Sequence, residues 1–366
     1  MLVRIKEFFR ALTPKQIVFS LITIVSFILY LILTIWSDYK VANLIDQQVA
    51  ERWDKEGGSA QVSCFFAEGV EVDDYMIISF EKQLEQSLNE VLPPEEKERE
   101  NGERLFIDAY SSMGTIEVVS EKGHLKATAV GCGGDFFLFH PIQLVSGGYF
   151  SGSDLMKDGI ILDEDAAWQL FGSSDIAGMT VWIGDVPHHV TGVIKRQEGR
   201  FAKRAGLDKT VVYVSAETLA NYGTSDGISV YEVTAPNPVK GFVYNCIKEK
   251  FGVEENDMIM VENSSRYLKD ALIPVILDYG TRSMQDRAVR FPYWENIARG
   301  WEDVKALVLL FQFLFLLIPA IIIFIFLIGK WRNRKWNMKD VGNFLIDMKG
   351  RLLLKMKGEK DRWQDF

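Results

Sequence analysis

The chain has 366 residues, of which 48% are hydrophobic, and it carries a formal net charge of −9 at pH 7. This acidic balance argues against nucleic acid as a partner, because binding to phosphates requires a basic surface. The length is sufficient for one large domain or two smaller ones, each with its own buried core.

Residues 1–15 are basic and amphipathic. Apolar side chains recur at helical spacing from Leu2 to Leu12, and basic side chains lie between them. This pattern predicts a short cytoplasmic helix that rests on the inner leaflet of a membrane. A disordered basic tail is the alternative.

Residues 16–36 form an uncharged run that ends at Trp36. A cleaved signal peptide would also follow basic residues, but this run is longer than a typical signal core. The residues that follow it, Ser37 and Asp38, do not form a small-x-small cleavage site. The run therefore predicts a first transmembrane helix, with Trp36 at the membrane interface.

Residues 37–304 are predicted to form an α+β extracytoplasmic domain. The first helix is expected to continue to about Lys55, and an amphipathic helix is expected at 72–91, with Asp73 or Asp74 able to cap it. Residues 93–103 form a charge run and are predicted to be a solvated loop. Alternating apolar residues predict strands at 61–66, 104–109, 115–120 and 126–130.

The stretch from about 135 to 226 has a different sequence pattern from the residues before it, with short apolar runs separated by Gly and Asp. It predicts a small, mostly β module with short helices at 164–171 and 217–222 and a strand at 211–214. After it come a strand at 229–234, a helix at 238–251 and a strand at 258–262. The parts before and after the module together predict a split ferredoxin-like unit with the β module inserted in its middle.

A second uncharged run of 23 residues extends from Ala306 to Ile328. A helix of this length is about 34 Å long, enough to cross a hydrocarbon core of about 30 Å. We assign the second transmembrane helix to residues 305–328. Pro319 is expected to kink it, and Gln312 is expected to face another helix, because an unpaired amide in lipid is costly.

Charge predicts the orientation of the two spans. The whole chain carries a net charge of −9. Residues 1–15 carry +3 and the tail, residues 329–366, carries +6, so the segment 37–305 must carry −18. By the positive-inside rule both termini are cytoplasmic and the acidic domain lies outside the cell membrane.

The chain contains three cysteines, Cys64, Cys132 and Cys246, and no C-x-x-C pair. An odd number without close spacing indicates neither a zinc site nor a disulfide framework. The simpler interpretation is that they are small buried apolar residues, and one bridge remains open.

Residue patterns typical of enzymes are not recognisable. His188 and His189 are adjacent, so on a strand they point to opposite faces and cannot chelate one ion; both are expected on the strand surface. Asp163, Glu164 and Asp165 precede a predicted helix, where carboxylates favour the helix dipole. There is no Walker motif and no serine with a recognisable general base. We expect no catalytic residue, no metal site and no cofactor.

Residues 135–194 resemble the extracytoplasmic core domain of MacB/FtsX-type ABC transporter permeases. The segments that carry the likeness follow in chain order, namely 135–137 (DFF), Leu144, 147–150 (GGYF), 153–154 (SD), 159–162 (GIIL), 166–167 (AA), 170–172 (LFG), 176–178 (IAG), 181–183 (VWI) and 190–194 (VTGVI). The wider layout to about residue 330 is also similar. In that family a ferredoxin-like Porter part is interrupted by a β-rich Sabre part, between two spans.

The resemblance implies a permease-like subunit that couples a cytoplasmic ABC ATPase to the outer domain without being an enzyme itself. Full-length family members have two further spans, so a second permease chain is expected to supply them, unless the basic tail replaces their coupling segment. Coupling or helix-packing candidates are Gln312, Pro319, the helix at 292–305, and Arg351 and Lys355 in the tail. The alternative is a membrane-anchored sensor or scaffold whose outer domain binds a ligand or a protein without transport.

Overall fold

The computed structural model describes residues 13–55, 57–93, 104–282, 289–332 and 348–349. The chain forms two compact units: residues 35–309, which contain the outer domain, and the remainder, which contains most of the two apolar runs. The predicted helix at 2–13 and the tail candidates Arg351 and Lys355 lie outside the described residues.

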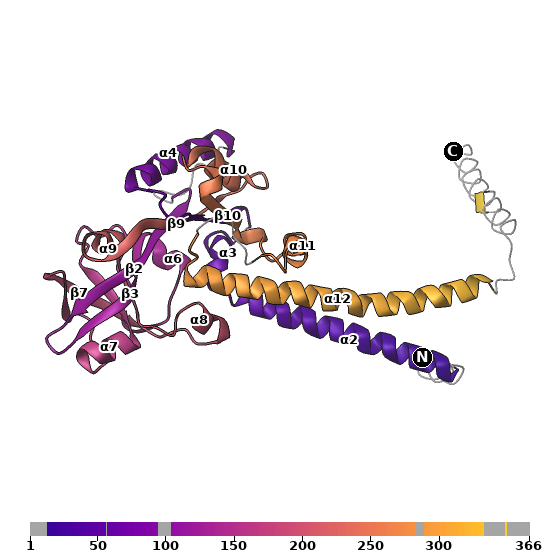
Figure 1. The fold of residues 1–366 in the computed structure, drawn as a ribbon. Coiled ribbons are helices and arrows are strands. Elements are labelled where there is room, and N and C mark those ends of the chain that lie inside the picture. Colours follow the sequence, from indigo (N-terminus) through magenta and orange to yellow (C-terminus); the bar gives the residue numbers. More distant parts are fainter. Residues whose placement is uncertain (1–12, 56, 94–103, 283–288, 333–347, 350–366) are drawn as a thin grey trace, which may run out of the picture. The chain divides into compact units, whose positions relative to one another are not determined.

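The bounds of the elements are as follows (Figure 1). The long helices are α2 (Pro14–Ala42) and α12 (Tyr293–Arg332). The shorter helices are α3 (Val49–Trp53), α4 (Asp74–Val91), α6 (Phe136–Phe139), α7 (Glu164–Phe171), α8 (Arg200–Arg204), α9 (Ala216–Tyr222), α10 (Phe242–Lys250) and α11 (Lys269–Leu277), with 3-10 turns η1 (Ile45–Gln47), η2 (Glu255–Asp257) and η3 (Asn263–Ser265). The strands are β1 (Ser59–Phe66), β2 (Ile107–Val119), β3 (His124–Gly134), β4 (Leu144–Gly147), β5 (Gly159–Asp163), β6 (Thr180–Ile183), β7 (Val186–Ile194), β8 (Val211–Ser215), β9 (Thr224–Pro236) and β10 (Met258–Glu262).

The described strands join in one mixed sheet, in the order β10-β1-β9-β2-β3-β8-β5-β7-β4, with β6 pairing to β2 and β7. The first four strands are all antiparallel to their neighbours. Together with α4 after β1 and α10 after β9, this is the strand order of a split βαβ unit. The predicted ferredoxin-like part is therefore present, and the strands from β3 to β8 are inserted between its second and third strands.

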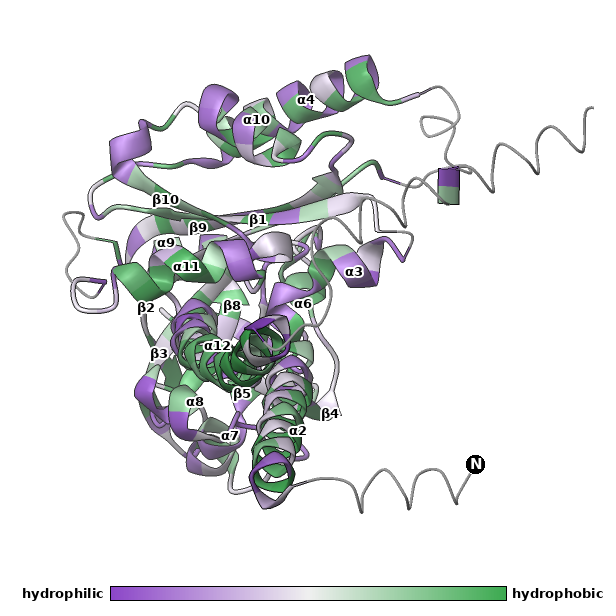
Figure 2. Cartoon of the chain, turned by 90° about the vertical axis from the view of Figure 1, so that its right-hand side faces the viewer, coloured by the Kyte–Doolittle hydropathy of each residue, from purple (hydrophilic) through white to green (hydrophobic). Residues whose placement is uncertain are grey.

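One face of the ferredoxin-like part is an apolar layer under α4 and α10. Alternate residues of β1, from Ala60 to Phe66, pack with Phe80 and Leu84 of α4 and with Val243 of α10. Figure 2 shows the two helices above β1, β9 and β10. This side is the conventional core, because strand residues at i and i+2 share a face and bury their apolar side chains together.

The inserted part has a second apolar core around α7. Ile160 and Leu162 of β5, Ala166 and Leu170 of α7, and Val193 of β7 lie in one buried cluster. Asp163 begins α7 by accepting a hydrogen bond from the Ala166 amide at 2.7 Å, as expected for a helix cap. The helices α6 and α8 in this part were not predicted.

Two predictions for the outer domain were wrong. The first helix ends at Ala42 rather than about Lys55, because Gln61 of β1 binds the following turn through the Asp46 carbonyl and the Val49 amide. The strands expected at 104–109 and 115–120 are one strand, β2, which pairs with β3 along its length and meets β9 with register shifts near Ser112.

The helices α2 and α12 are long and apolar enough to cross a membrane. Only 6% and 11% of their most apolar windows are buried, which is unlike the core helix of a soluble domain. In the unit that contains most of these runs, the Gln312 amide donates to Thr34 Oγ1 at 2.9 Å, so it faces α2 as expected. Helix α12 continues through Pro319, and the kink expected there stays a prediction.

Candidate functional site

The face of the sheet opposite α4 and α10 is unusually polar. On β1, Gln61 and Ser63 point to this side, and Glu232 of β9 joins them; all three are buried. Buried polar groups are costly unless they are hydrogen-bonded. Here each of them has partners from distant segments of the chain.

His140 lies at the centre of this polar layer and has no exposed surface. Its Nδ1 lies 3.1 Å from Asp46 Oδ1, and its Nε2 lies 2.5 Å from Glu232 Oε2. Burial by itself lowers the pKa of His140, but the charge of Glu232 and the hydrogen bonds to Asp46 and Glu232 outweigh it and raise the pKa to about 9. At neutral pH the ring is therefore a buried imidazolium between two carboxylates.

From Glu232 the hydrogen bonds continue across the sheet to Arg266. Ser63 Oγ donates to Glu232 Oε1 at 2.6 Å, and Asn263 Nδ2 donates to Ser63 Oγ at 2.7 Å. Arg266 Nη1 then donates to Asn263 Oδ1 at 3.2 Å. A chain of polar contacts thus links His140 to a buried guanidinium.

Arg266 binds the first turns of α12. Its two Nη atoms donate to the two carboxylate oxygens of Glu295 at 2.6 and 2.7 Å, and its Nε donates to Glu302. Arg282 also donates to Glu302 and to Asp303. A bidentate guanidinium–carboxylate pair fixes both distance and orientation, so the start of α12 is held rigidly against η3.

The segment that follows α2 enters the same network. Asp46 binds His140, and Gln47 Oε1 accepts a hydrogen bond from Arg266 Nη1 at 3.2 Å. Gln61 Oε1 accepts a hydrogen bond from the Val49 backbone amide at 3.0 Å, and Gln61 Nε2 donates one to the Asp46 carbonyl at 2.8 Å. We call Asp46, His140, Glu232, Ser63, Asn263, Arg266, Glu295 and Glu302 the buried charge network.

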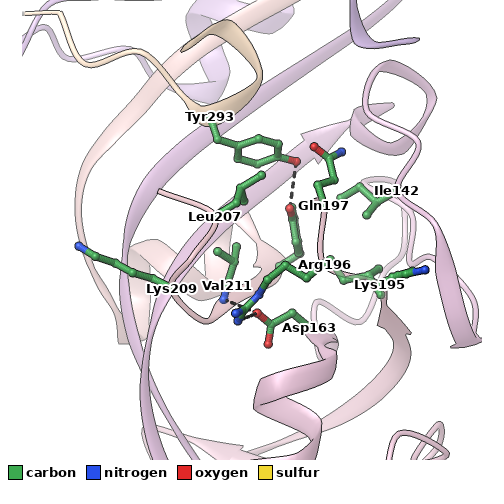
Figure 3. A pocket seen from close by; sticks show the side chains of 11 residues that line it. Ile142, Asp163, Lys195, Arg196, Gln197, Leu207, Lys209, Val211 and Tyr293 are labelled. Carbon is green, nitrogen blue, oxygen red and sulfur yellow. Dashed lines mark hydrogen bonds and ion pairs between the residues drawn. The ribbon is translucent and has the colours of Figure 1, made fainter. Parts of the chain in front are cut away.

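Three successive residues of α12 contact three different parts of the domain. Tyr293 accepts a hydrogen bond from Tyr213 of β8 in the inserted part at 2.9 Å. Trp294 stacks on His140 with ring centroids 4.2 Å apart, and Glu295 binds Arg266. Figure 3 shows Tyr293 above a small gap between Asp163, Arg196 and Leu207. This gap has a volume of about 20 Å³, which is room for one water rather than for a substrate.

Nearer the apolar runs, α2 and α12 contact each other directly within the domain. Trp36 and Trp301 have ring centroids 6.3 Å apart, and Lys305 Nζ lies 3.0 Å from Asp38 Oδ1. The two helices are therefore joined where the apolar run of α2 ends and just before the apolar run of α12 begins.

A second feature of the domain is a cleft between α4 and the inserted part. It has two hollows of about 600 and 350 Å³ that share Asp74, Tyr110 and Gly152 in their walls. Its larger half contains the carboxyls of Asp108 and Glu81; burial, followed by the charge of Glu81, raises the pKa of Asp108 to about 8. The cleft is acidic and large enough for a small molecule.

Other residues that the sequence analysis discussed lie apart from the buried charge network. The three cysteines are free and buried, which agrees with the simpler interpretation. His189 is exposed as expected, but His188 is buried, because its strand packs against Thr218 of α9; its Nε2 lies 3.5 Å from Thr218 Oγ1. In the described part of the chain, no group of three or more His, Cys, Asp or Glu side chains is arranged to hold a metal ion.

The sequence analysis did not identify the members of the buried charge network. Two of them interrupt apolar runs: His140 follows the four apolar residues of α6, and Glu232 lies within β9. A charged residue inside an otherwise apolar strand is the pattern that could have indicated a buried partner. The partners themselves are 92 and 94 positions away from His140 and could not be inferred from spacing.

The family model of the MacB-like periplasmic core domain matches residues 18–240, which is more than half of the chain. The chain belongs to this family. Membership confirms the predicted resemblance to MacB-like permeases and the predicted fold, an α+β domain of MacB type with two apolar helices at its ends. The chain is thus a membrane protein of the ABC transporter permease family with a MacB-like extracytoplasmic domain.

Individual relatives are distant and match only in part. The chain is 30% identical over 79 residues to the macrolide export ATP-binding/permease protein MacB of Chromobacterium violaceum, covering 21% of this chain and 12% of that protein. It is 23% identical over 162 residues to the protein of the same name from Shewanella oneidensis, covering 41% of this chain and 25% of that protein. The periplasmic region of MacB from Actinobacillus actinomycetemcomitans is 17% identical, with 57% of this chain and 91% of that chain covered and a TM-score of 0.38. The MacB-like chain therefore aligns with no more than a quarter of the length of these two curated relatives.

Proposed function

We propose that this chain is a permease-like membrane subunit of an ABC transporter or an ABC mechanotransmission complex, which passes movement between a cytoplasmic ATPase and its extracytoplasmic domain. In this proposal both termini are cytoplasmic and the two apolar runs of α2 and α12 cross the cell membrane. The basic balance at both ends supports this orientation.

The observation that carries the proposal is the double connection of the buried charge network. Asp46 and Gln47, which follow α2, and Glu295 and Glu302, which begin α12, are bound to the same few side chains. Because these bonds also reach Ser63 and Glu232 in the sheet, a displacement of α12 or of the segment after α2 would move the sheet or break these contacts.

Such a network is better suited to transmission than to stability alone. Replacing a buried ion pair by apolar residues is often neutral or stabilising, whereas removing one partner leaves an uncompensated charge and costs about 3–5 kcal/mol. Packed interfaces of this kind move as rigid bodies between discrete arrangements. The network would therefore make the sheet follow the segment after α2 and the first turns of α12.

The proposed partners are an ABC ATPase and a second permease chain, and the name of the MacB relatives, ATP-binding/permease proteins, supports the ATPase as a partner. Gln312 and Pro319 would act in helix packing within the membrane. Arg351 and Lys355 would contact the ATPase from the tail.

The first test is affinity purification of the tagged chain from its own host in mild detergent, with the ATPase rate of the purified complex as the second readout. We expect an ABC ATPase and a second permease chain in near-stoichiometric amounts. The double substitution R266M/E295M should preserve the complex and the folded domain, since it removes both partners of the bidentate pair and leaves Glu302 paired with Arg282, but it should reduce the dependence of the ATPase rate on the outer domain.

A matched control is K248M/E255M, which removes an exposed ion pair on α10 and η2 far from α12. This variant should leave the ATPase rate unchanged. Recovery of the chain without any ABC ATPase, from an extract in which a known ABC complex stays intact, would contradict the proposal.

A membrane-anchored sensor or scaffold is the second candidate, and the acidic cleft between α4 and the inserted part favours it. In that case the outer domain would bind a ligand or a protein without transport. Purification with partners of the outer face only would support this function over the first.

A further inference from the structure

Helix α11 exposes apolar side chains although it belongs to the outer domain. Leucine, isoleucine, valine, alanine and proline make up seven of its nine residues, KDALIPVIL, and only Leu272 is buried. Ile273 and Leu277, which are four residues apart and share a face, are 49% and 78% exposed. Tyr279, just after the helix, is 61% exposed. Figure 2 shows α11 as mostly hydrophobic.

Both ends of α11 are held against the part of α12 that precedes its apolar run. Before α11, the Tyr267 hydroxyl donates to the Ala298 carbonyl at 3.2 Å, and Lys305 Nζ lies 5.9 Å from the centre of the Tyr267 ring. After α11, Arg282 donates to Glu302 and Asp303. Figure 1 shows α11 beside this first part of α12.

These contacts lie on α12 close to the start of its apolar run. At 1.5 Å per residue, Asp303 and Ala298 lie about 5 and 12 Å from Ala306, where the apolar run begins. A headgroup layer beside the hydrocarbon core is about 5–8 Å thick, so Asp303 falls within that distance of the run and Ala298 falls beyond it. The pair Trp36–Trp301 lies within the same range and marks the same interface.

We propose that α11 is an interfacial helix, which docks on the outer leaflet of the bilayer that α12 enters, with Ile273, Leu277 and Tyr279 among the lipid. A lipid surface fits because residues on both sides of α11 contact the part of α12 that contains Trp301 and leads into the apolar run. Placing these side chains among lipid would remove their apolar surface from water, which is favourable. Docking would fix the tilt of the domain, and this inference rests on the membrane placement of α12 but not on a coupling role.

The test uses the full chain in nanodiscs of phosphatidylethanolamine and phosphatidylglycerol. Leu277→Cys carries an environment-sensitive fluorophore, and Leu155→Cys, at a side chain that is 98% exposed on the inserted part, carries the same label as the matched control. The unsubstituted chain gives the labelling background, because its three cysteines are buried. Thermal unfolding of each variant shows whether the fold is preserved.

We expect the label at Leu277 to show a blue-shifted emission and a loss of intensity when lipids with a nitroxide at the headgroup are included, and the label at Leu155 to show neither. An unshifted, unquenched label at Leu277 would overturn the proposal, because the helix would then face water. A blue shift without quenching would also overturn it, since a second copy or another protein would then cover the helix.

Discussion

His140 has both ring nitrogens bound to carboxylates and lies under Trp294. In water, exposed ion pairs contribute little, but inside a protein a charge with satisfied partners fixes one arrangement of the segments that carry those partners. At the scale of single residues, the protonated ring of His140 therefore joins Asp46, which follows α2, to Glu232 in β9 and to Trp294 in α12.

A first prediction concerns the stability of the domain between pH 6.5 and 9. The pKa of His140 is about 9 in the folded chain and about 6.5 when the chain is unfolded, so the imidazolium contributes fully below pH 6.5 and its contribution is lost as the pH rises through 9. The loss should amount to about 3 kcal/mol. The variant H140Q should be less stable than the unsubstituted chain at pH 6 and nearly equal to it above pH 9, as measured by thermal unfolding.

The comparison with H140Q is needed because Asp108 titrates in the same range. Its raised pKa, about 8, means that the protonated carboxyl is favoured in the folded state, and this contribution too falls as the pH rises. The matched control is H189Q, which removes an exposed histidine and should follow the unsubstituted profile. Parallel profiles for H140Q and the unsubstituted chain would contradict the prediction.

At the scale of elements, the described parts of the two apolar runs are joined by one polar contact. The Thr34 hydroxyl donates to the Tyr30 carbonyl at 2.9 Å and accepts the Gln312 amide at 2.9 Å. An amide in hydrocarbon is costly without a partner, so this pair favours association of α2 and α12 at one register.

The second prediction follows from this pair. The variants Q312L and T34V should each weaken the helix–helix association. The double variant should lose less association free energy than the two single variants lose together, and the difference, the coupling energy, should be about 0.6 kcal/mol. Reversible unfolding in bicelles measures it. As a control, T23V removes a hydroxyl that bonds to the Phe19 carbonyl of its own helix and should show no coupling to Q312L. Fully additive effects of Q312L and T34V would show that the contact does not form in the membrane.

For the whole molecule, the charge distribution makes a prediction about orientation. A membrane-impermeant maleimide should label Leu155→Cys in intact cells, and it should label Lys349→Cys only after the membrane is permeabilised. The unsubstituted chain is the background, because burial raises the pKa of the Cys64 and Cys132 thiols and lowers their reactivity. Labelling of both positions in intact cells would contradict the proposed cytoplasmic termini.

Much of the fold could be predicted from local patterns. The helix at 164–171 agrees with α7 at both ends, and strand β10 agrees at both ends too, because Asp163 caps the helix and short apolar runs between turn residues specify strands locally. The break after Ala42 could not be predicted, because the residue that causes it, Gln61, lies on another element. Helix α11 was not predicted either. Seven apolar residues follow one another in it, so its sequence lacks the alternation of apolar and polar residues that indicates a helix.

By itself the sequence determined the two apolar runs, the acidic segment between them, the split ferredoxin-like pattern and the family resemblance. Each of these properties depends on neighbouring residues or on a sum over a segment, so hydropathy, charge and the order of elements are sufficient to predict it. Only the tertiary structure decided which charges meet. Asp46, His140, Glu232, Arg266 and Glu295 come from distant parts of the chain, and only the strand order and the docking of α12 bring them into contact.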